Sequence, residues 1–249
     1  MKRIMLVIIA LACLLPAFSN GYAETQECPY QASTSWTAAF ASVATGQIVP
    51  SIAPAELKHP PEYEITPSDI ARVAGARLFV IAGYERMMQT IADASTIEQE
   101  KVIKVTTQNT LDRITEAVVK IAKAAGTEAI AQKNLERFES LFSQAREEVV
   151  KQGLDKLRCY VNINQEPLAR DIGLNVAGTF GPGPVTAQQI KLVSDSKFDI
   201  IIDNIHNPVA DPFTSVSQDS VFLTWRNFPE ETGPDALYKV IEENLKALI

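Results

Sequence analysis

The chain contains two histidines, and both stand where a ligand-binding residue of an α/β protein is expected. His59 and His206 lie in proline-containing loops directly after predicted strands, one in each half of the chain. Neutral imidazole is a favoured ligand of zinc and other transition metals, and carboxylates complete such sites. Glu85 follows another predicted strand, and the preceding turn aims its carboxylate at the same sheet edge. We expect His59, Glu85 and His206 to bind one divalent metal ion.

Other side chains in the loops after predicted strands suit the wall of a cleft, because ligands collect at the carboxyl ends of parallel strands. Asp203 and Asn204 are placed to orient His206 by hydrogen bonds. The turn at 181–184 either binds an anion through backbone N–H groups or forms a rigid bend, and its two prolines favour the bend. The predicted cleft and orienting residues are Trp36, Glu62, Tyr84, Asn162, Asp203, Asn204 and Asn227.

Sequence signatures of common enzymes are missing. The chain has no Gly-x-Ser-x-Gly, His-Glu-x-x-His, Gly-Lys-Ser/Thr phosphate loop or Cys-x-x-Cys. No nucleophile stands beside a base, so we predict a binding protein and no enzyme, with a metal-dependent hydrolase as the enzymatic alternative. A single histidine in a polar loop is usually solvent-exposed or hydrogen-bonded, so the metal hypothesis depends on the pair.

Short apolar runs alternate with helical patterns along the chain, which predicts parallel α/β units. The predicted strands are 30–33, 48–52, 78–82, 102–105, 159–163, 175–180, 199–202 and 221–225. The predicted helices are 36–43, 167–172, 186–193 and 236–248, with another that starts at Thr66. Thr66 can cap that helix, Pro67 suits its first position, and Asp69 favours its N-terminus.

Residues 108–154 show helical spacing without strands. Leu111, Ile114 and Val118 keep one apolar stripe up to Gly126, and the stripe resumes at Leu135. We therefore predict a long helical connector that bends at 126–127. The predicted fold class is α/β, with two lobes that contain parallel sheets and are joined by a long rigid helix. The N-terminal lobe is 24–107, the connector 108–154 and the C-terminal lobe 155–249.

The first residues resemble an export signal. Lys2 and Arg3 precede an apolar run at 4–18, and Gly21 and Ala23 are small residues of the kind that signal peptidase reads. We predict a signal peptide at 1–23 and a periplasmic protein, with lipidation at Cys13 as the alternative. Cys28 and Cys159 remain in an oxidising compartment, where they either pair or stay as buried thiols.

Charge excludes one class of partner. Removal of residues 1–23 takes away two of the 23 basic residues and none of the 30 acidic ones, which leaves a net charge of −9. No basic stripe remains, so nucleic acid is a poor partner, and we expect a monomer.

Several segments together resemble the zinc/manganese solute-binding proteins of ABC importers. The segments that carry the resemblance are 33–39, 62–69, 82–85, 168–174, 176–181, 203–208 and 227–229. The resemblance implies two lobes bridged by a rigid helix, one metal ion in the cleft between them, and delivery of that ion to a membrane permease. The transported ligand would be zinc or manganese.

The usual metal ligands of that family are absent from their positions. Pro61, the stretch 106–109, Asn162 and Asn227 stand where the resemblance leads us to expect ligands, and His206 stands where many relatives carry Glu. We therefore expect a rebuilt site of two imidazoles and a carboxylate, which suits zinc first and then manganese, iron or nickel. The alternative is a receptor of the same fold for a chelated metal or a small organic solute, held by Trp36, Tyr84 and Asn162.

Overall fold

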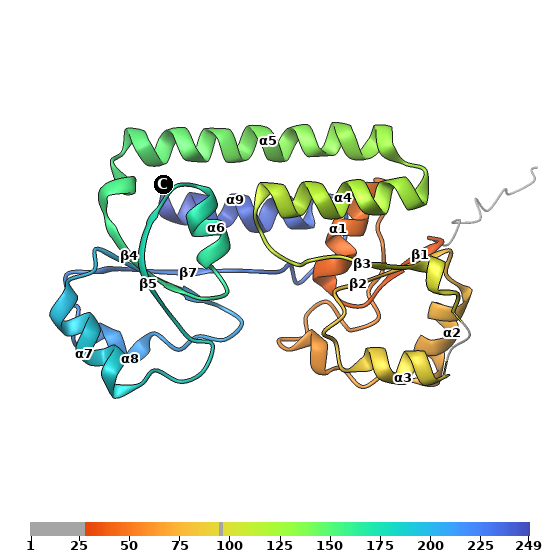
Figure 1. Ribbon diagram of the computed structural model, residues 1–249, viewed down its shortest axis with the longest axis horizontal. Coiled ribbons are helices and arrows are strands. Elements are labelled where there is room, and N and C mark those ends of the chain that lie inside the picture. Colours follow the sequence, from red (N-terminus) through yellow and green to blue (C-terminus); the bar gives the residue numbers. More distant parts are fainter. Residues whose placement is uncertain (1–27, 95–96) are drawn as a thin grey trace, which may run out of the picture.

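The computed structural model describes residues 28–94 and 97–249 of the chain. Two lobes, each built around a parallel sheet, lie side by side beneath a long helix (Figure 1). The predicted signal peptide and Cys13 lie outside the described residues. Within the described part, no helix has both the length and the apolar composition that a membrane span requires.

The N-terminal lobe contains the strands β1 (Tyr30–Ala32), β2 (Leu78–Ile81) and β3 (Val102–Lys104), which pair in parallel in the order β1-β2-β3. Every residue of β2 is buried, as expected for a central strand covered on both faces. Leu78 and Val80 belong to the core cluster that contains α1 (Ser35–Thr45). Phe79 and Ile81 pack on the opposite side, beside α2 (Pro67–Gly75) and α3 (Met87–Ala94).

The C-terminal lobe contains β4 (Arg158–Asn162), β5 (Asn175–Phe180), β6 (Ile200–Asn204) and β7 (Val221–Trp225) in the order β5-β4-β6-β7, all parallel. Its outer face packs against α7 (Ala187–Ser196) and α8 (Asp211–Thr214), where the Tyr160 ring contacts Phe180 and Phe213. The helix α6 (Glu166–Asp171) follows β4 and contacts β4 and β5.

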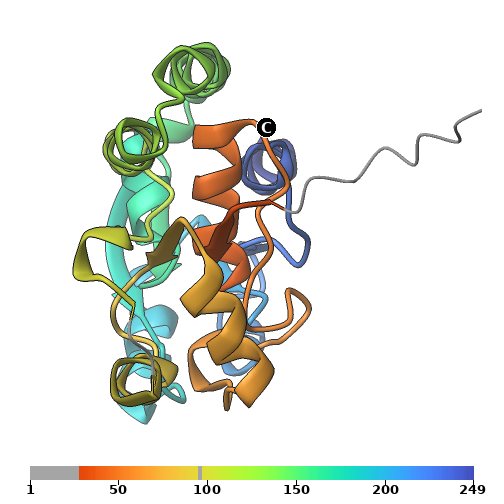
Figure 2. The same ribbon diagram turned by 90° about the vertical axis from the view of Figure 1, so that its right-hand side faces the viewer.

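Two antiparallel helices, α4 (Leu111–Ala125) and α5 (Glu128–Lys151), form the predicted connector. Gly126 ends α4 in a left-handed conformation with φ of 74°, which glycine adopts without steric cost. The predicted bend at 126–127 is therefore a complete reversal, and of the two helices α5 is the one that extends over both lobes (Figure 1). Figure 2 shows α4 and α5 end-on, beside α1 and α9 (Ala236–Leu248).

One hydrophobic core continues through both lobes. It includes β-strand residues of each sheet together with the inner faces of α1, α4, α5 and α9, among them the fully buried Phe40 and Phe142. Hydrogen bonds also tie the start of the connector to the C-terminal lobe: Asn109 Nδ2 donates to the Asn227 carbonyl at 2.9 Å, and the Leu111 amide donates to Asp171 Oδ2 at 2.7 Å. These contacts fix the width of the space between the lobes.

The predicted strand at 48–52 is wrong. Only one bridge forms, between Ala32 and Ser51, because Pro50 has no N–H group and can only accept a hydrogen bond, from the Ala32 amide. The other predicted strands are confirmed, and so is the helix start at Thr66, whose side chain and that of Asp69 form a reciprocal capping box. The helices α3 and α8 and the short 3-10 turns η1 (Pro60–Glu62), η2 (Gln99–Lys101) and η3 (Leu154–Lys156) were not predicted.

Candidate functional site

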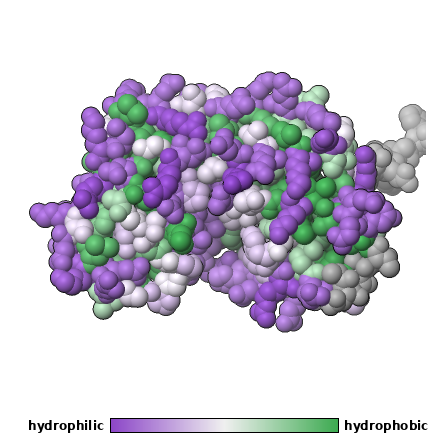
Figure 3. All heavy atoms as spheres, in the orientation of Figure 1, coloured by the Kyte–Doolittle hydropathy of each residue, from purple (hydrophilic) through white to green (hydrophobic). Residues whose placement is uncertain are grey.

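The carboxyl ends of the strands in both sheets border a cleft between the lobes, with a volume of about 440 Å³. Figure 3 shows a notch between the lobes on the edge opposite α5. The residues that line the cleft are Thr34, Ser35, Trp36, Lys58, His59, Pro60, Pro61, Tyr84, Thr107, Gln108, Ile163, Asn164, Pro167, Asn204, His206, Asn207, Asn227 and Phe228. Both lobes contribute, so a solute in this cleft contacts both.

His206 contributes a buried imidazole to the cleft. Its ring is buried and stacks on Phe228, with 3.6 Å between the ring centroids. The Nε2 atom lies 3.2 Å from the Phe228 carbonyl oxygen, and because a carbonyl only accepts, Nε2 carries the proton. Burial lowers the pKa of His206 to about 4, although the hydrogen bond to Phe228 raises it. His206 is therefore neutral at pH 7 with its free lone pair on Nδ1, the form that binds metals.

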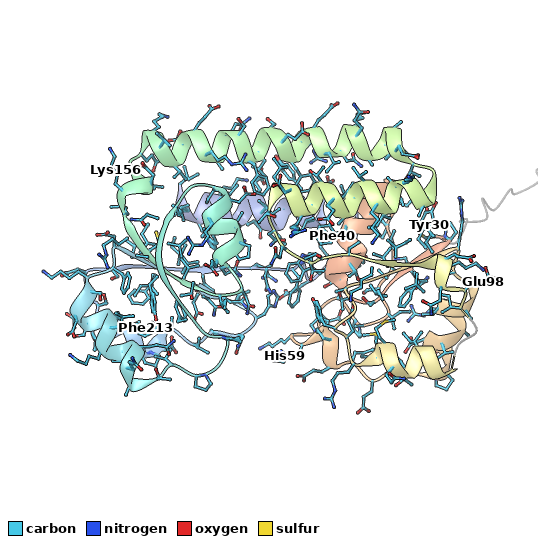
Figure 4. All side chains as sticks on the ribbon, in the orientation of Figure 1. Tyr30, Phe40, His59, Glu98, Lys156 and Phe213 are labelled. Atoms are coloured by element: carbon cyan, nitrogen blue, oxygen red, sulfur yellow. The ribbon has the colours of Figure 1, made fainter. Side chains whose placement is uncertain are left out.

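His59 lies on the opposite wall, in the exposed loop that precedes η1. Figure 4 shows it on the part of the N-terminal lobe that faces the C-terminal lobe. Burial is the main cause of the lowered pKa of His206, and a coulombic interaction with His59 is the smallest contribution to it. The structure thus brings together the two histidines that the sequence places 147 positions apart.

Glu85 is buried and does not line the cleft. Its Oε1 accepts hydrogen bonds from the Ser33 hydroxyl and, at 2.8 Å, from the Ala82 amide, and its Oε2 accepts one from the Gly83 amide at 2.5 Å. The carboxylate therefore orders the loop after β2 and ties it to the end of β1. Its role as a metal ligand stays a prediction.

Asp203 and Asn162 form a buried network behind the cleft. Asp203 accepts from Asn162 Nδ2 at 3.0 Å and from the amides of Val209 and Ala210 at 2.8 Å each. Asn204, which does line the cleft, accepts from the His206 amide at 3.3 Å. These bonds hold the loop that carries His206 at both its ends.

Aromatic rings and unpartnered polar atoms make up much of the remaining wall. Trp36 lies against Phe228, with 5.9 Å between ring centroids, and the Tyr84 hydroxyl lies 2.9 Å from Thr107 Oγ1. Three buried polar atoms of cleft residues have no hydrogen-bond partner, namely Trp36 Nε1, Ser35 Oγ and Asn227 Oδ1. A buried N–H group without an acceptor costs about 1–3 kcal/mol, so a ligand that supplies the missing acceptor removes this cost and binds more tightly.

Most of the predicted site residues reach the cleft. His59, His206, Trp36, Tyr84, Asn204 and Asn227 line it, whereas Glu85, Asn162 and Asp203 are buried behind it. Glu62 lines a separate shallow hollow on the other side of His59. Sequence reasoning missed Lys58, Ser35 and Phe228 as cleft residues, although Lys58 precedes His59 and Phe228 follows the last strand.

The described ranges contain no group of three or more His, Cys, Asp or Glu side chains arranged to hold a metal ion. Cys28 and Cys159 are free thiols in this structure, Cys28 half-buried and Cys159 buried. Burial raises the pKa of both thiols, that of Cys159 to about 11, so neither is a thiolate at pH 7. The cleft therefore offers imidazoles, amides and hydroxyls, and no thiolate.

The two parallel-sheet lobes, the bridging α5 and the cleft between the lobes define a two-lobed α/β fold with an interlobe cleft. Solved structures with this fold include the solute-binding protein FpvC from Pseudomonas aeruginosa in complex with Mn²⁺, at 17% identity and a TM-score of 0.66, covering 88% of this chain and 96% of that chain. FpvC with Ni²⁺ has the same identity and TM-score and covers 88% and 94%.

A periplasmic metal-binding protein from Candidatus Liberibacter asiaticus has 13% identity and a TM-score of 0.60, covering 88% of this chain and 99% of that chain. No protein-family model and no curated protein sequence matches the chain. The structural similarity confirms the predicted two-lobed α/β fold.

Proposed function

We propose that this chain is the extracytoplasmic receptor of an ABC importer, which binds a divalent transition metal in the interlobe cleft and delivers it to a membrane permease. The observation that carries the proposal is that the only two histidines of the chain, one from each lobe, line the same cleft. The fold supports it, since the similar structures are those of metal-binding proteins from the periplasm or of solute-binding proteins with bound metal.

The two histidines have different roles in this proposal. His206 is held neutral by burial and oriented by the Phe228 carbonyl, which is the arrangement of a pre-formed imidazole ligand. His59 is exposed on a loop and closes onto the metal from the other lobe. Because α5 and the common core fix the lobes, we propose that movement of the His59 loop signals occupancy to the permease.

Calorimetric titration of the chain from Glu24 onward with zinc and manganese tests the metal site. We expect one ion per chain, with zinc bound more tightly because imidazole favours it. The His59→Ala/His206→Ala double variant should give no binding heat, and its circular dichroism spectrum should show that it is folded, although the loss of the buried His206 ring lowers its melting temperature. Unchanged binding by the double variant would show that the metal lies elsewhere.

Location and delivery need separate experiments. N-terminal sequencing of protein recovered from the periplasm should begin at Glu24, and a chain that begins at Cys13 would establish the lipoprotein alternative. Uptake of radioactive zinc should fall when the gene is deleted, and the histidine double variant should fail to restore it. Sedimentation should give a monomer.

A further inference from the structure

The cleft contains too little negative charge for a bare divalent cation. Among the described residues that line it, none is Asp or Glu, and Lys58 is the only Lys or Arg. Two neutral imidazoles leave both positive charges of the ion uncompensated, and the Lys58 ammonium repels it. Zinc sites in proteins hold the ion with three or four side chains, often with carboxylate or thiolate among them, and two imidazoles fall short of that number.

The two carboxylates buried behind the cleft, Glu85 and Asp203, are already engaged. Both oxygens of Glu85 accept bonds from the ends of β1 and β2, and both oxygens of Asp203 accept bonds within the C-terminal lobe. Neither residue lines the cleft. A ligand that carries its own negative groups neutralises the charge of the metal ion, and the hydrogen bonds of Glu85 and Asp203 stay intact.

One side of the cleft is built to receive such groups. The first turn of α1 borders it through Thr34, Ser35 and Trp36, so the N-terminal end of that helix dipole lies at the cleft, and the buried Glu85 carboxylate behind it, bonded to Ser33, offsets part of its positive charge. Ser35 is fully buried, and its Oγ has no partner. The Trp36 Nε1–H group, which only donates, also has none. Both atoms are shielded from solvent, so a ligand reaches them only where the cleft wall moves, whereas Lys58 is exposed and can donate directly to a negative group.

The size of the cleft agrees with an organic ligand. A volume of about 440 Å³ falls within the range of small-molecule pockets, which is roughly 300–1,000 Å³. One ion and its first water molecules occupy much less, since each water takes about 30 Å³. The rings of Trp36, Tyr84 and Phe228 add apolar surface that a bare ion does not use.

We propose that the cargo is a divalent metal already bound to a small anionic chelator that carries carboxylates. His59 and His206 bind the metal, while Lys58, the Trp36 N–H group and the start of α1 bind the carboxylates. This inference rests on the proposed function and names the class of its solute.

Equilibrium dialysis with radiolabelled citrate and, separately, labelled nitrilotriacetate tests the proposal, with zinc buffered at one free concentration throughout. We expect one labelled chelator per chain in the presence of zinc and none in its absence. Zinc retention at the same free zinc should rise about tenfold or more when the preferred chelator is added.

Matched variants distinguish the groups that bind the chelator from those that bind the metal. Lys58→Gln should lower chelator retention about tenfold or more, because a charge-assisted hydrogen bond is lost, and should strengthen binding of zinc alone, because the repelling ammonium is gone. Trp36→Phe should lower chelator retention several-fold. Lys133→Gln, on the exposed face of α5, and Trp225→Phe, which removes another unpartnered indole N–H outside the cleft, should change neither.

Three other outcomes would each overturn the chelator proposal, and they differ in what they imply for the metal function. Zinc binding without retention of either chelator overturns the inference and leaves the proposed metal receptor standing. Retention of chelator without zinc overturns the inference and the metal function in favour of an organic-anion receptor. Absence of both zinc and chelator binding overturns both.

Discussion

Asp203→Asn should destabilise the C-terminal lobe strongly although it removes no atom from the core. Each carboxylate oxygen accepts two bonds: Oδ1 from Asn162 Nδ2 and the Asn204 amide, and Oδ2 from the amides of Val209 and Ala210. An asparagine in this place turns its NH₂ group toward one pair of donors, so two bonds are lost.

The magnitude follows from those two bonds. A hydrogen bond to a charged acceptor contributes about 1.5–3 kcal/mol, so the free energy of unfolding should fall by about 3–6 kcal/mol. Urea unfolding followed by circular dichroism and tryptophan fluorescence measures the change. The control is Asp211→Asn, eight residues on and exposed, which should change stability by about 0.5 kcal/mol or less.

The outcome also bears on His206, because the Asp203 network anchors the far end of the loop that contains it. Partial loss of stability should therefore come with weaker zinc binding. If Asp203→Asn and Asp211→Asn unfold at the same urea concentration, the assignment of Asp203 as the anchor of this loop is wrong.

Three further predictions concern pH, the core and one turn. In metal-free protein the pKa of His206 is lowered from 6.5 to about 4, so as the pH falls the unfolded chain takes up the proton first. The free energy of unfolding should therefore be highest above pH 6.5 and should fall by about 3 kcal/mol between pH 6.5 and 4. Urea unfolding of His206→Gln at several pH values should lack this decrease. Phe138→Ala leaves a cavity in the common core and should lower the free energy of unfolding by about 3–5 kcal/mol. Calorimetry should show a single unfolding transition, and two separate transitions would contradict one shared core. Gly46→Ala should lower the melting temperature, because φ is 69° there and a Cβ would meet Ile130 Cγ2 at 2.9 Å, while Gly75→Ala, which meets nothing within 4 Å, should not.

The elements were largely predictable because their signals are local. The strands β5 and β7 and the helix α9 have the predicted bounds, since each is an apolar run or stripe closed by turn residues. The start of α2 was equally clear, because Thr66, Pro67 and Asp69 act within one turn of the chain. Local sequence encodes such features fully.

Errors arose where a partner distant in sequence decides the structure. The apolar run at 48–52 reads as a strand, but Pro50 limits it to one bridge with Ala32. The break at Gly126 was visible, yet whether the next helix bends or reverses depends on packing between α4 and α5, which periodicity does not reveal.

The candidate site was predictable in position and less so in orientation. The rule that ligands bind at the carboxyl ends of parallel strands placed His59, His206, Trp36 and Tyr84 at the cleft. The same rule cannot tell which way a carboxylate turns, and Glu85 turns back to amides only two and three residues away. Lys58 was missed because a lysine in a polar loop carries no distinguishing pattern.

The absence of carboxylates from the described cleft lining has a kinetic consequence. Without residues 1–23 the chain carries −9 at pH 7, and this net charge acts on an arriving solute most strongly at low ionic strength, where the Debye length rises to about 30 Å. A bare cation is attracted, so its association rate falls as salt is added, whereas an anionic complex is repelled and its association rate rises. The direction of the salt effect in stopped-flow measurements thus reports the sign of the cargo's charge before the cargo has been identified chemically.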